Sequence, residues 1–349
     1  MSNYDQFAAA VKEISGGKNV VLLDDLGLPS VYVPINKLKN SEIISGGSEN
    51  THPAFSVDGV EKSRFLYSKY QNIIINGRAY SLSHRDPKTY VNFDQARQAC
   101  EAKGAGFHLG TLAEWAAVAL LTRKMGTMPH GNNNYGGDSA YTYEKGQESA
   151  KDNNKTGRTF TGSGPATWGH DHTQFGIQDM NGNVWEWLGG MRLNEGEIQI
   201  IPYNNAALGS ECDMSASSTL WKAIKNDGSL VAPGTAATLK YDFVSGNIQL
   251  TTGITSAQDA GRGGSYTTMT LASGVTAPEL AKALILYPDE PGKDYGGDYH
   301  WMNNAGECLP LAGGSWNDGA DAGVFYLDLG YARSDSAGTV GFRSAYVEL

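Results

Sequence analysis

The segment 313–345 constrains the fold most, because rigid framework residues alternate there with small or polar residues. Its sequence is GGSWNDGADAGVFYLDLGYARSDSAGTVGFRSA. Side chains alternate between two faces along an extended chain, so residues 324–331 would form a strand with one apolar face. That face would carry Phe325, Leu327 and Leu329, and the opposite face Tyr326, Asp328 and Gly330. The pattern predicts an anchored strand whose second face is free to bind.

The composition is that of a globular, loop-rich protein. The chain has 349 residues, 40% of them hydrophobic, which is enough for one large domain or two with a sizeable core. Its 44 glycines, 18 tyrosines and 7 tryptophans favour a mixed fold of short elements joined by turns and packed by aromatic rings. Long regular helices are not expected.

Charge and cysteine content exclude several classes of protein. The net charge of -10 and the absence of a basic run argue against nucleic-acid binding. Cys100, Cys212 and Cys308 are far apart and odd in number, which predicts buried thiols rather than disulfides or a zinc site. The first residues lack signal-peptide character and no apolar run reaches membrane length, so we expect synthesis in a cytoplasm without membrane insertion.

Helices and strands are predicted from hydrophobic spacing and turn residues. The sequence predicts helices at 3–14, 93–103 and 111–123, the last beginning with a capping-box spacing of Thr111 and Glu114. The segment 126–172 is rich in Gly, Asn, Ser and Thr and predicts a long ordered loop. Strands are predicted at NVVLL, SVYVPI, RFLYSKY, NIIINGRAYSL, EIQII and NIQLTTG.

Two sets of motifs carry a resemblance to known families. The C-terminal GGSW, ARS and GFRSA motifs are similar to those of the variable proteins of diversity-generating retroelements, which have a C-type lectin fold. FGIQDMNGNVWEW at 175–187 resembles the core signature of the formylglycine-generating enzyme family, with further matches in FHLGTLAEWAAVALL, PHGNNNYG and PSVYVPINKL. The resemblance implies an α+β C-type lectin fold of the formylglycine-generating enzyme type, with short antiparallel strands, flanking helices and long ordered loops.

The expected domain organisation follows from these matches. Residues 1–27 form an N-terminal lead segment, and 28–349 form the C-type lectin domain of the formylglycine-generating type. An elaboration occupies about 191–266, and the variable segment lies at about 313–345.

The resemblance also implies which residue types can occur at the variable positions, because it restricts their codons. In the variable proteins, AAY codons become NNY codons, which cannot encode Lys, Glu, Gln, Met or Trp. None of these five types occurs at the candidate positions, although this would happen by chance about one time in ten. The resemblance implies one exposed ligand-binding patch made of Asp318, Asp321, Tyr326, Asp328, Gly330, Tyr331, Asp335, Ala337, Gly338 and Thr339.

The DMNGNVWEW segment implies a structural calcium site by the same resemblance. The side chains of Asp179 and Glu186 and the carbonyls near Gly182 and Val184 would supply the oxygen ligands that calcium prefers. The alternative is a tight turn packed by its two tryptophans. No organic cofactor is expected.

Other candidate residues favour structural roles. His170 and His172 lack a third ligand and are interpreted as loop residues. Trp316 is predicted to plug the core beneath the variable surface, and Arg333 and Arg343 to pair internally.

Binding is favoured over catalysis. The active-site cysteines of the related enzymes would follow the GGSW motif, but Asn317 and Asp318 stand after Trp316 and Cys308 precedes the motif. The resemblance implies a protein whose diversified surface binds a protein or glycan receptor on a cell, displayed on a phage tail or microbial surface. The alternatives are an enzyme related to the formylglycine-generating or sulfoxide-forming oxidases, and a structural virion protein. The oligomeric state stays open.

Overall fold

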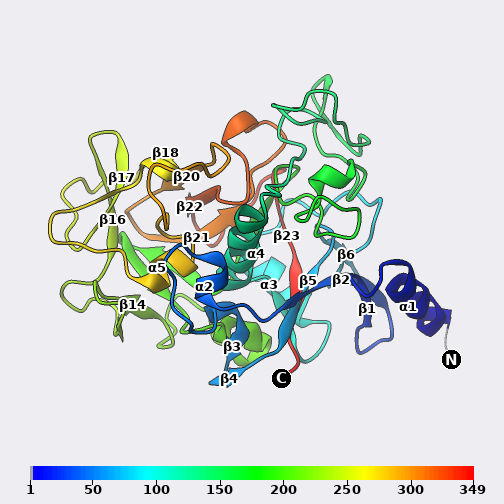
Figure 1. The fold of residues 1–349 in the computed structure, drawn as a ribbon, viewed down its shortest axis with the longest axis horizontal. Coiled ribbons are helices and arrows are strands. Elements are labelled where there is room, and N and C mark those ends of the chain that lie inside the picture. Colours follow the sequence, from blue (N-terminus) through cyan, green and yellow to red (C-terminus); the bar gives the residue numbers. More distant parts are fainter. Residues whose placement is uncertain (1–2) are drawn as a thin grey trace.

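The computed structural model describes residues 3–349, which form a mixed fold of short helices and many short strands (Figure 1). The helices are α1 (Asn3–Ile14), α2 (Asn40–Ile43), α3 (Phe93–Glu101), α4 (Leu112–Met125) and α5 (Glu279–Ala283). The predicted helices at 3–14, 93–103 and 111–123 are confirmed as α1, α3 and α4, with ends shifted by at most two residues.

Helix α4 runs through the middle of the molecule (Figure 1). The predicted capping box is present: the Glu114 amide donates to the Thr111 hydroxyl at 3.1 Å, and the Thr111 amide donates to the Glu114 carboxylate at 3.0 Å. The helix ends at Gly126, whose φ of 70° is a left-handed conformation that glycine adopts without strain. Most of its side chains are buried, which agrees with its apolar sequence.

A five-stranded sheet joins the two ends of the chain. Strand β24 from the C-terminal segment lies between β5 and β8, both from the first third of the sequence. The strands in spatial order are β1 (Val20–Leu23), β2 (Pro29–Asn36), β5 (Arg64–Ser68), β24 (Ser344–Tyr346) and β8 (Phe107–Leu109). Because β1 pairs with β2, residues 20–23 are attached to residues 29–32 through backbone hydrogen bonds.

A larger sheet holds the C-terminal strands and the region 191–266. Its main path is β18 (Arg262–Ser265), β20 (Tyr299–Met302), β22 (Leu327–Tyr331), β21 (Glu307–Ala312), β12 (Met191–Asn194), β13 (Glu197–Ile200), β16 (Lys240–Val244), β17 (Asn247–Thr251) and β19 (Thr270–Leu271). Strand β11 (Trp185–Trp187) pairs with β21 and β23 (Val340–Phe342), and β14 (Lys222–Ile224) pairs with β13 and β15 (Leu230–Val231). The elaboration is therefore continuous with the C-terminal strands.

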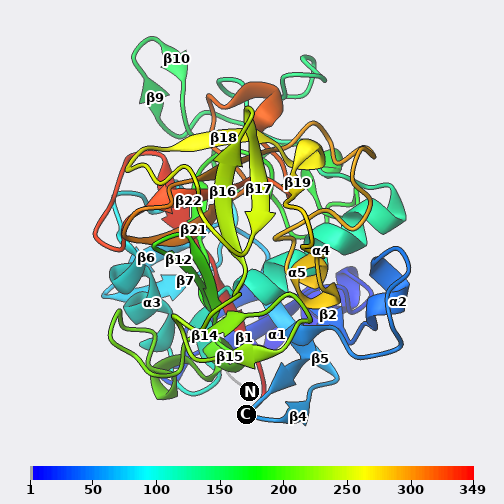
Figure 2. The same cartoon turned by 90° about the vertical axis from the view of Figure 1, so that its left-hand side faces the viewer.

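Three small hairpins lie outside these sheets. They are β3–β4 (Ser56–Val57, Val60–Glu61), β6–β7 (Ile73–Ile75, Arg78–Tyr80) and β9–β10 (Lys151–Asp152, Lys155–Thr156). Figure 2 shows β16 and β17 side by side on one face and the β9–β10 hairpin projecting from the molecule. This last hairpin belongs to the predicted loop 126–172, which otherwise carries only one short 3-10 turn.

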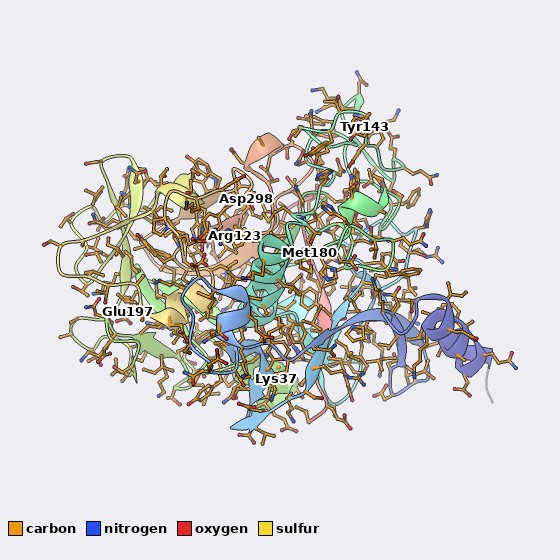
Figure 3. The ribbon with its side chains drawn as sticks, in the orientation of Figure 1. Lys37, Arg123, Tyr143, Met180, Glu197 and Asp298 are labelled. Atoms are coloured by element: carbon orange, nitrogen blue, oxygen red, sulfur yellow. The ribbon has the colours of Figure 1, made fainter. Side chains whose placement is uncertain are left out.

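The core lies around α4 and between the sheets. Met180 is fully buried beside α4 (Figure 3), together with Trp115 and Phe325. Cys100, Cys212 and Cys308 are buried and unpaired, as the sequence predicts. Among residues 3–349, no helix has the length and apolar character needed to cross a membrane.

Candidate ligand-binding surface

The GGSW motif forms a tight turn, and the packing of the core limits which residues fit in it. Gly313 and Gly314 have φ values of 92° and 82°, in the left-handed region. A Cβ at Gly313 would stand 2.8 Å from the Met180 carbonyl oxygen and 3.2 Å from the Trp115 ring, so only glycine fits there. Trp316 is buried, at 7% exposed, but it is not part of the hydrophobic core clusters of the described residues, and its indole nitrogen donates to Asp152 of the β9–β10 hairpin at 3.3 Å.

Strand β22 carries the predicted alternation. Leu327 and Leu329 are fully buried, while Asp328 and Gly330 on the other face are partly exposed. Phe325 is also fully buried and stacks on Tyr266, with ring centroids 5.5 Å apart. The predicted apolar anchor is therefore confirmed.

Tyr326 is a correction to the predicted exposed patch, because it is only 4% exposed. The strand begins at Leu327, and Tyr326 lies in a turn in which its amide donates to the Gly323 carbonyl at 3.1 Å. The turn directs its ring inward against Trp185, with centroids 4.4 Å apart, and Trp301 donates to its hydroxyl at 3.0 Å. Tyr326 is part of the support and not of the outer surface.

The other nine candidate positions are exposed or partly exposed, and Asp321 and Asp335 are the most open of them. We call these nine residues the variable surface: Asp318, Asp321, Asp328, Gly330, Tyr331, Asp335, Ala337, Gly338 and Thr339.

The tryptophans of β11 bring the two ends of the variable surface together. Tyr331 meets Trp187 edge to face, with centroids 6.3 Å apart. The Trp185 amide donates to the Thr339 carbonyl at 2.8 Å, and Ala337 packs against the same apolar cluster. Residues 327–331 and 337–339 therefore share one support.

The carboxylates lie close enough to influence each other. Burial, followed by the charge of Asp318, raises the pKa of Asp328 to about 7. Burial also raises the pKa of Asp318, with a contribution from Asp321. The phenol of Tyr331 has a raised pKa for the same reasons, burial first and then the charges of Asp328, Asp318 and Asp335. These couplings connect the acidic positions with Tyr331.

Three of these carboxylates, Asp318, Asp328 and Asp335, also hold local turns. Asp318 accepts hydrogen bonds from the Ser315 amide at 2.6 Å and the Ser315 hydroxyl at 2.9 Å. Asp328 accepts from the Gly330 amide at 2.8 Å. Asp321 has no such bond among the described residues, and Asp335 accepts from the Ala332 amide at 2.8 Å while staying exposed.

A cavity of about 360 Å³ adjoins this region, and part of its wall is the segment from Ala320 to Val324. His130, which contacts Glu144 at 3.0 Å, lines it together with Asp298. Burial raises the pKa of Asp298 to about 8, and one of its oxygens accepts from the Phe325 amide at 2.7 Å. Figure 3 places Asp298 in this part of the molecule. Sequence reasoning missed the cavity, because its residues are distant in the chain.

The turn expected to hold calcium is arranged around a side chain. The Gln71 amide nitrogen lies 3.1 Å from the Asp179 carbonyl, 3.4 Å from the Gly182 carbonyl and 2.9 Å from the Val184 carbonyl. It also lies 3.0 Å from a carboxylate oxygen of Glu186. One oxygen of the Asp179 carboxylate accepts from the Gly162 amide at 2.8 Å, and the other is buried without a hydrogen-bond partner among residues 3–349. The four predicted ligand residues are brought together, but around an amide.

The framework arginines pair internally, as predicted. Arg343 is buried and its Nε lies 2.7 Å from a carboxylate oxygen of Glu186. Arg333 lies 3.0 Å from Glu307 and 3.1 Å from Asp94. These pairs fix the ends of the segment that carries the variable surface.

The two histidines behave as loop residues. The His170 ring accepts from the Ile177 amide at 2.8 Å, and burial lowers its pKa to about 4. His172 contacts the Met128 carbonyl at 2.9 Å. Within residues 3–349, no three His, Cys, Asp or Glu side chains are grouped so as to hold a metal ion.

The solved structures that resemble this chain include a variable protein and two variants of a tropism determinant. Variable protein 1 of Treponema denticola is 13% identical with a TM-score of 0.35, covering 94% of this chain and 98% of that chain. The U1 variant of the Major Tropism Determinant is 12% identical with a TM-score of 0.31, covering 90% of this chain and 62% of that chain. The P3c variant of the Major Tropism Determinant is 11% identical with a TM-score of 0.32, covering 94% of this chain and 71% of that chain. None of the curated proteins matches the sequence.

The family described as the sulfatase-modifying factor enzyme 1-like domain matches residues 39–270, more than half of the chain. Together with the short antiparallel strands, flanking helices and long loops, this match confirms the expected α+β fold of the formylglycine-generating type. The chain belongs to the sulfatase-modifying factor enzyme 1-like domain family.

Proposed function

We propose that the protein is a receptor-binding protein whose variable surface contacts a protein or glycan on a cell. The proposal rests on the separation of buried anchor residues from outward-facing residues in the C-terminal segment. Phe325, Leu327 and Leu329 are fully buried, whereas the nine residues of the variable surface lie outside this anchor. Exposed residues on a well-anchored segment can change with little loss of stability, because surface substitutions usually cost less than about 0.5 kcal/mol.

The chemistry of the variable surface suits recognition. Tyr331 offers an amphipathic ring that gains contact area with little loss of conformational entropy. Asp321 and Asp335 are exposed carboxylates that can accept hydrogen bonds from a receptor. A partner with hydroxyl, amide or basic groups would complement this surface.

We further propose that a retroelement diversifies these residues. The support is that none of the nine positions, nor Tyr326, holds a residue type that an NNY codon cannot encode. The turns at Gly313 and Gly314 and the ion pair of Arg343 lie outside these positions and hold the framework. Display on a phage tail or a microbial surface would give such diversification an effect on receptor choice.

Binding is better supported than an oxidase activity. A thiol acts as a nucleophile or copper ligand in its thiolate form. Burial raises the pKa of Cys212 to about 11 and that of Cys308 to about 12, and it also raises the pKa of Cys100. All three cysteines are buried, and none follows Trp316, where the resemblance places the active-site cysteines of the related enzymes.

Sequencing many copies of the gene from one population of its host tests the proposal. Nonsynonymous variation should concentrate in the codons of the nine residues of the variable surface, with a near-identical invariant template repeat nearby. The codons of Leu327, Leu329 and Trp316 should be constant and provide the internal control. Variation spread evenly over the chain would refute diversification, and receptor binding itself is tested by the affinity measurement described in the Discussion.

A further inference from the structure

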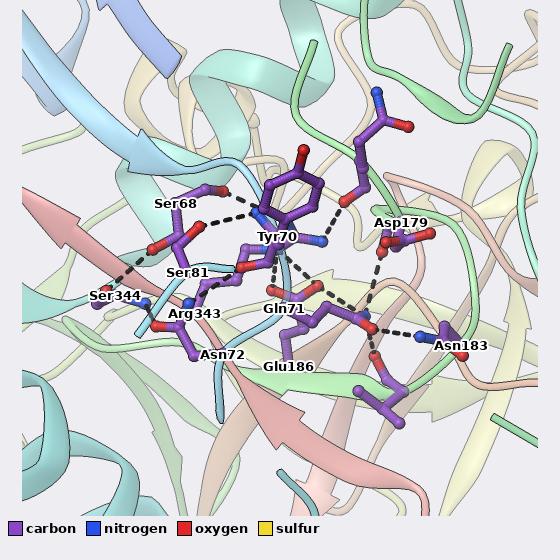
Figure 4. A network of polar contacts seen from close by, with 12 residues as sticks. Ser68, Tyr70, Gln71, Asn72, Ser81, Asp179, Asn183, Glu186, Arg343 and Ser344 are labelled. Atoms are coloured by element: carbon purple, nitrogen blue, oxygen red, sulfur yellow. Dashed lines mark hydrogen bonds and ion pairs between the residues drawn. The ribbon is translucent and has the colours of Figure 1, made fainter. Parts of the chain in front are cut away.

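Gln71 occupies the centre of a cage of oxygen atoms. Its side chain is 0% exposed, and its amide nitrogen faces three backbone carbonyls and one carboxylate at 2.9 to 3.4 Å. Figure 4 shows Gln71 between Asp179, Asn183 and Glu186. Four oxygens converge on this single nitrogen, as they would on a cation.

The hydrogen-bond network fixes which end of the amide enters the cage. The Asn183 amide nitrogen donates to the Gln71 side-chain oxygen at 2.8 Å. The Asn183 oxygen in turn accepts from the Thr159 amide at 2.8 Å and from Asn132 at 3.1 Å. Since a backbone amide can only donate, the orientation of Asn183 is set, and with it that of Gln71. The donor end of Gln71 must face the cage.

The charge of the cage is already balanced. Glu186 and Arg343 are both buried, and the two are joined by hydrogen bonds of 2.7 and 2.9 Å. The guanidinium also donates to the Lys69 carbonyl at 3.0 Å and the Ser68 carbonyl at 3.3 Å. A cation in the cage would therefore find its one carboxylate already neutralised.

The donor set does not fit a calcium ion while Gln71 is present. Calcium takes 6–8 oxygen ligands at about 2.3 to 2.6 Å. The cage offers four oxygens; one oxygen of the Asp179 carboxylate accepts from the Gly162 amide, and its other oxygen is buried without a hydrogen-bond partner in the described part of the chain. Three of the four distances, to Asp179, Val184 and Glu186, are those of ordinary amide hydrogen bonds, and the contact with the Gly182 carbonyl is longer, at 3.4 Å.

We propose that the Gln71 amide takes the place of a structural cation and holds the turn 179–186 without metal. Its two N–H groups are shared among the four oxygens, so they satisfy carbonyls that would otherwise be buried without a donor. The turn leads directly into β11, whose tryptophans support the variable surface. The support of that surface is thereby independent of calcium, whether or not the surface binds a receptor.

Metal analysis and melting curves of the parent protein test this first. Protein dialysed against calcium and then desalted should contain no stoichiometric calcium, and its melting temperature should be the same in millimolar calcium and in excess EDTA. Stoichiometric calcium, or a melting temperature that EDTA lowers, would overturn the proposal. This test needs no variant.

The variant Gln71→Ala provides the second test. Removing the amide leaves an oxygen-lined space, so the melting temperature should fall, and calcium or Tb³⁺ should raise it again by binding the freed oxygens. Tb³⁺ in this space should show luminescence excited through Trp185 and Trp187. A Gln71→Ala protein as stable as the parent would show that the amide does not hold the turn, and would overturn the proposal.

Gln199→Ala is the matched control. Gln199 is also a buried glutamine, and it donates to Glu197 at 2.7 Å and accepts from Arg192 at 2.8 Å. Its loss should lower the melting temperature without a response to calcium. An equal calcium response in Gln199→Ala would mean that the effect is not specific to the cage and would contradict the proposal, and if Gln71→Ala does not fold, the parent measurements decide alone.

Discussion

The ring of Tyr326 packs on the indole of Trp185 with centroids 4.4 Å apart, which joins the C-terminal segment to a strand from the middle of the chain. Trp301 completes the contact by donating to the Tyr326 hydroxyl at 3.0 Å. The variable surface therefore rests on an aromatic cluster in which Trp185 and Tyr326 are buried and Trp301 is partly exposed.

The first prediction concerns Tyr326. Since its ring is buried, Tyr326→Ala should reduce the free energy of unfolding by about 3 to 5 kcal/mol, as for other large core aromatics. Tyr326→Phe keeps the ring and loses only the bond to Trp301, so it should cost about 1 kcal/mol. Urea unfolding of both variants measures the difference. Equal stability of Tyr326→Ala and the parent would place this ring outside the core.

The second prediction concerns the glycines of the C-terminal turns. Gly313 and Gly319 both have positive φ, at 92° and 65°, so alanine strains the backbone at either position. Only at Gly313 would the added Cβ meet the core, 2.8 Å from the Met180 carbonyl, whereas no atom lies within 4 Å at Gly319. Gly313→Ala should therefore lower the melting temperature clearly more than Gly319→Ala. Equal losses would show that crowding plays no part.

The third prediction concerns pH. The pKa of Asp298 is raised by burial to about 8, whereas an unfolded aspartate has a pKa of about 3.9. Between about pH 4 and pH 8 the unfolded state loses this proton and the folded state keeps it, so rising pH favours unfolding. Stability from the protonated group is fully present below about pH 4 and is lost as the pH rises toward 8.

The variant Asp298→Asn isolates this effect, because an asparagine can still accept from the Phe325 amide but does not titrate. The difference in unfolding free energy between the parent and Asp298→Asn should move against the parent as the pH rises from about 4 to about 8. Urea unfolding at several pH values measures it. A difference that is constant with pH would contradict the assigned shift.

Much of the fold could be predicted because it depends on local sequence. The capping box at Thr111 and Glu114, the alternation of Leu327 and Leu329, and the turn glycines at Gly313 and Gly314 each act through neighbouring residues. Their structural outcomes follow from sequence spacing alone.

The buried position of Tyr326 and the contacts of Gln71 could not be predicted, because they depend on residues that are far apart in the sequence. The inward direction of Tyr326 depends on a turn that starts the strand at Leu327 and on Trp185, which is far away in the sequence. The Gln71 amide meets carbonyls more than 100 residues further along the chain, and no motif around Gln71 signals this. Contacts of this kind become visible only when the strands are placed in space.

The most direct measurement is the affinity of the labelled protein for intact cells, taken from a panel of strains and including at least one that the parent protein binds. The variant Asp321→Ala, Tyr331→Ala, Asp335→Ala removes two exposed side chains and the partly exposed ring of Tyr331 from the variable surface, and should melt within a few degrees of the parent. The variant Lys37→Ala, Lys62→Ala changes exposed or partly exposed residues elsewhere on the chain and serves as the control.

The account predicts that the triple variant binds at least about tenfold more weakly than the parent, a loss of about 1.4 kcal/mol, while the control binds as the parent does. A folded triple variant with the affinity of the parent would contradict the proposal that the variable surface binds the receptor.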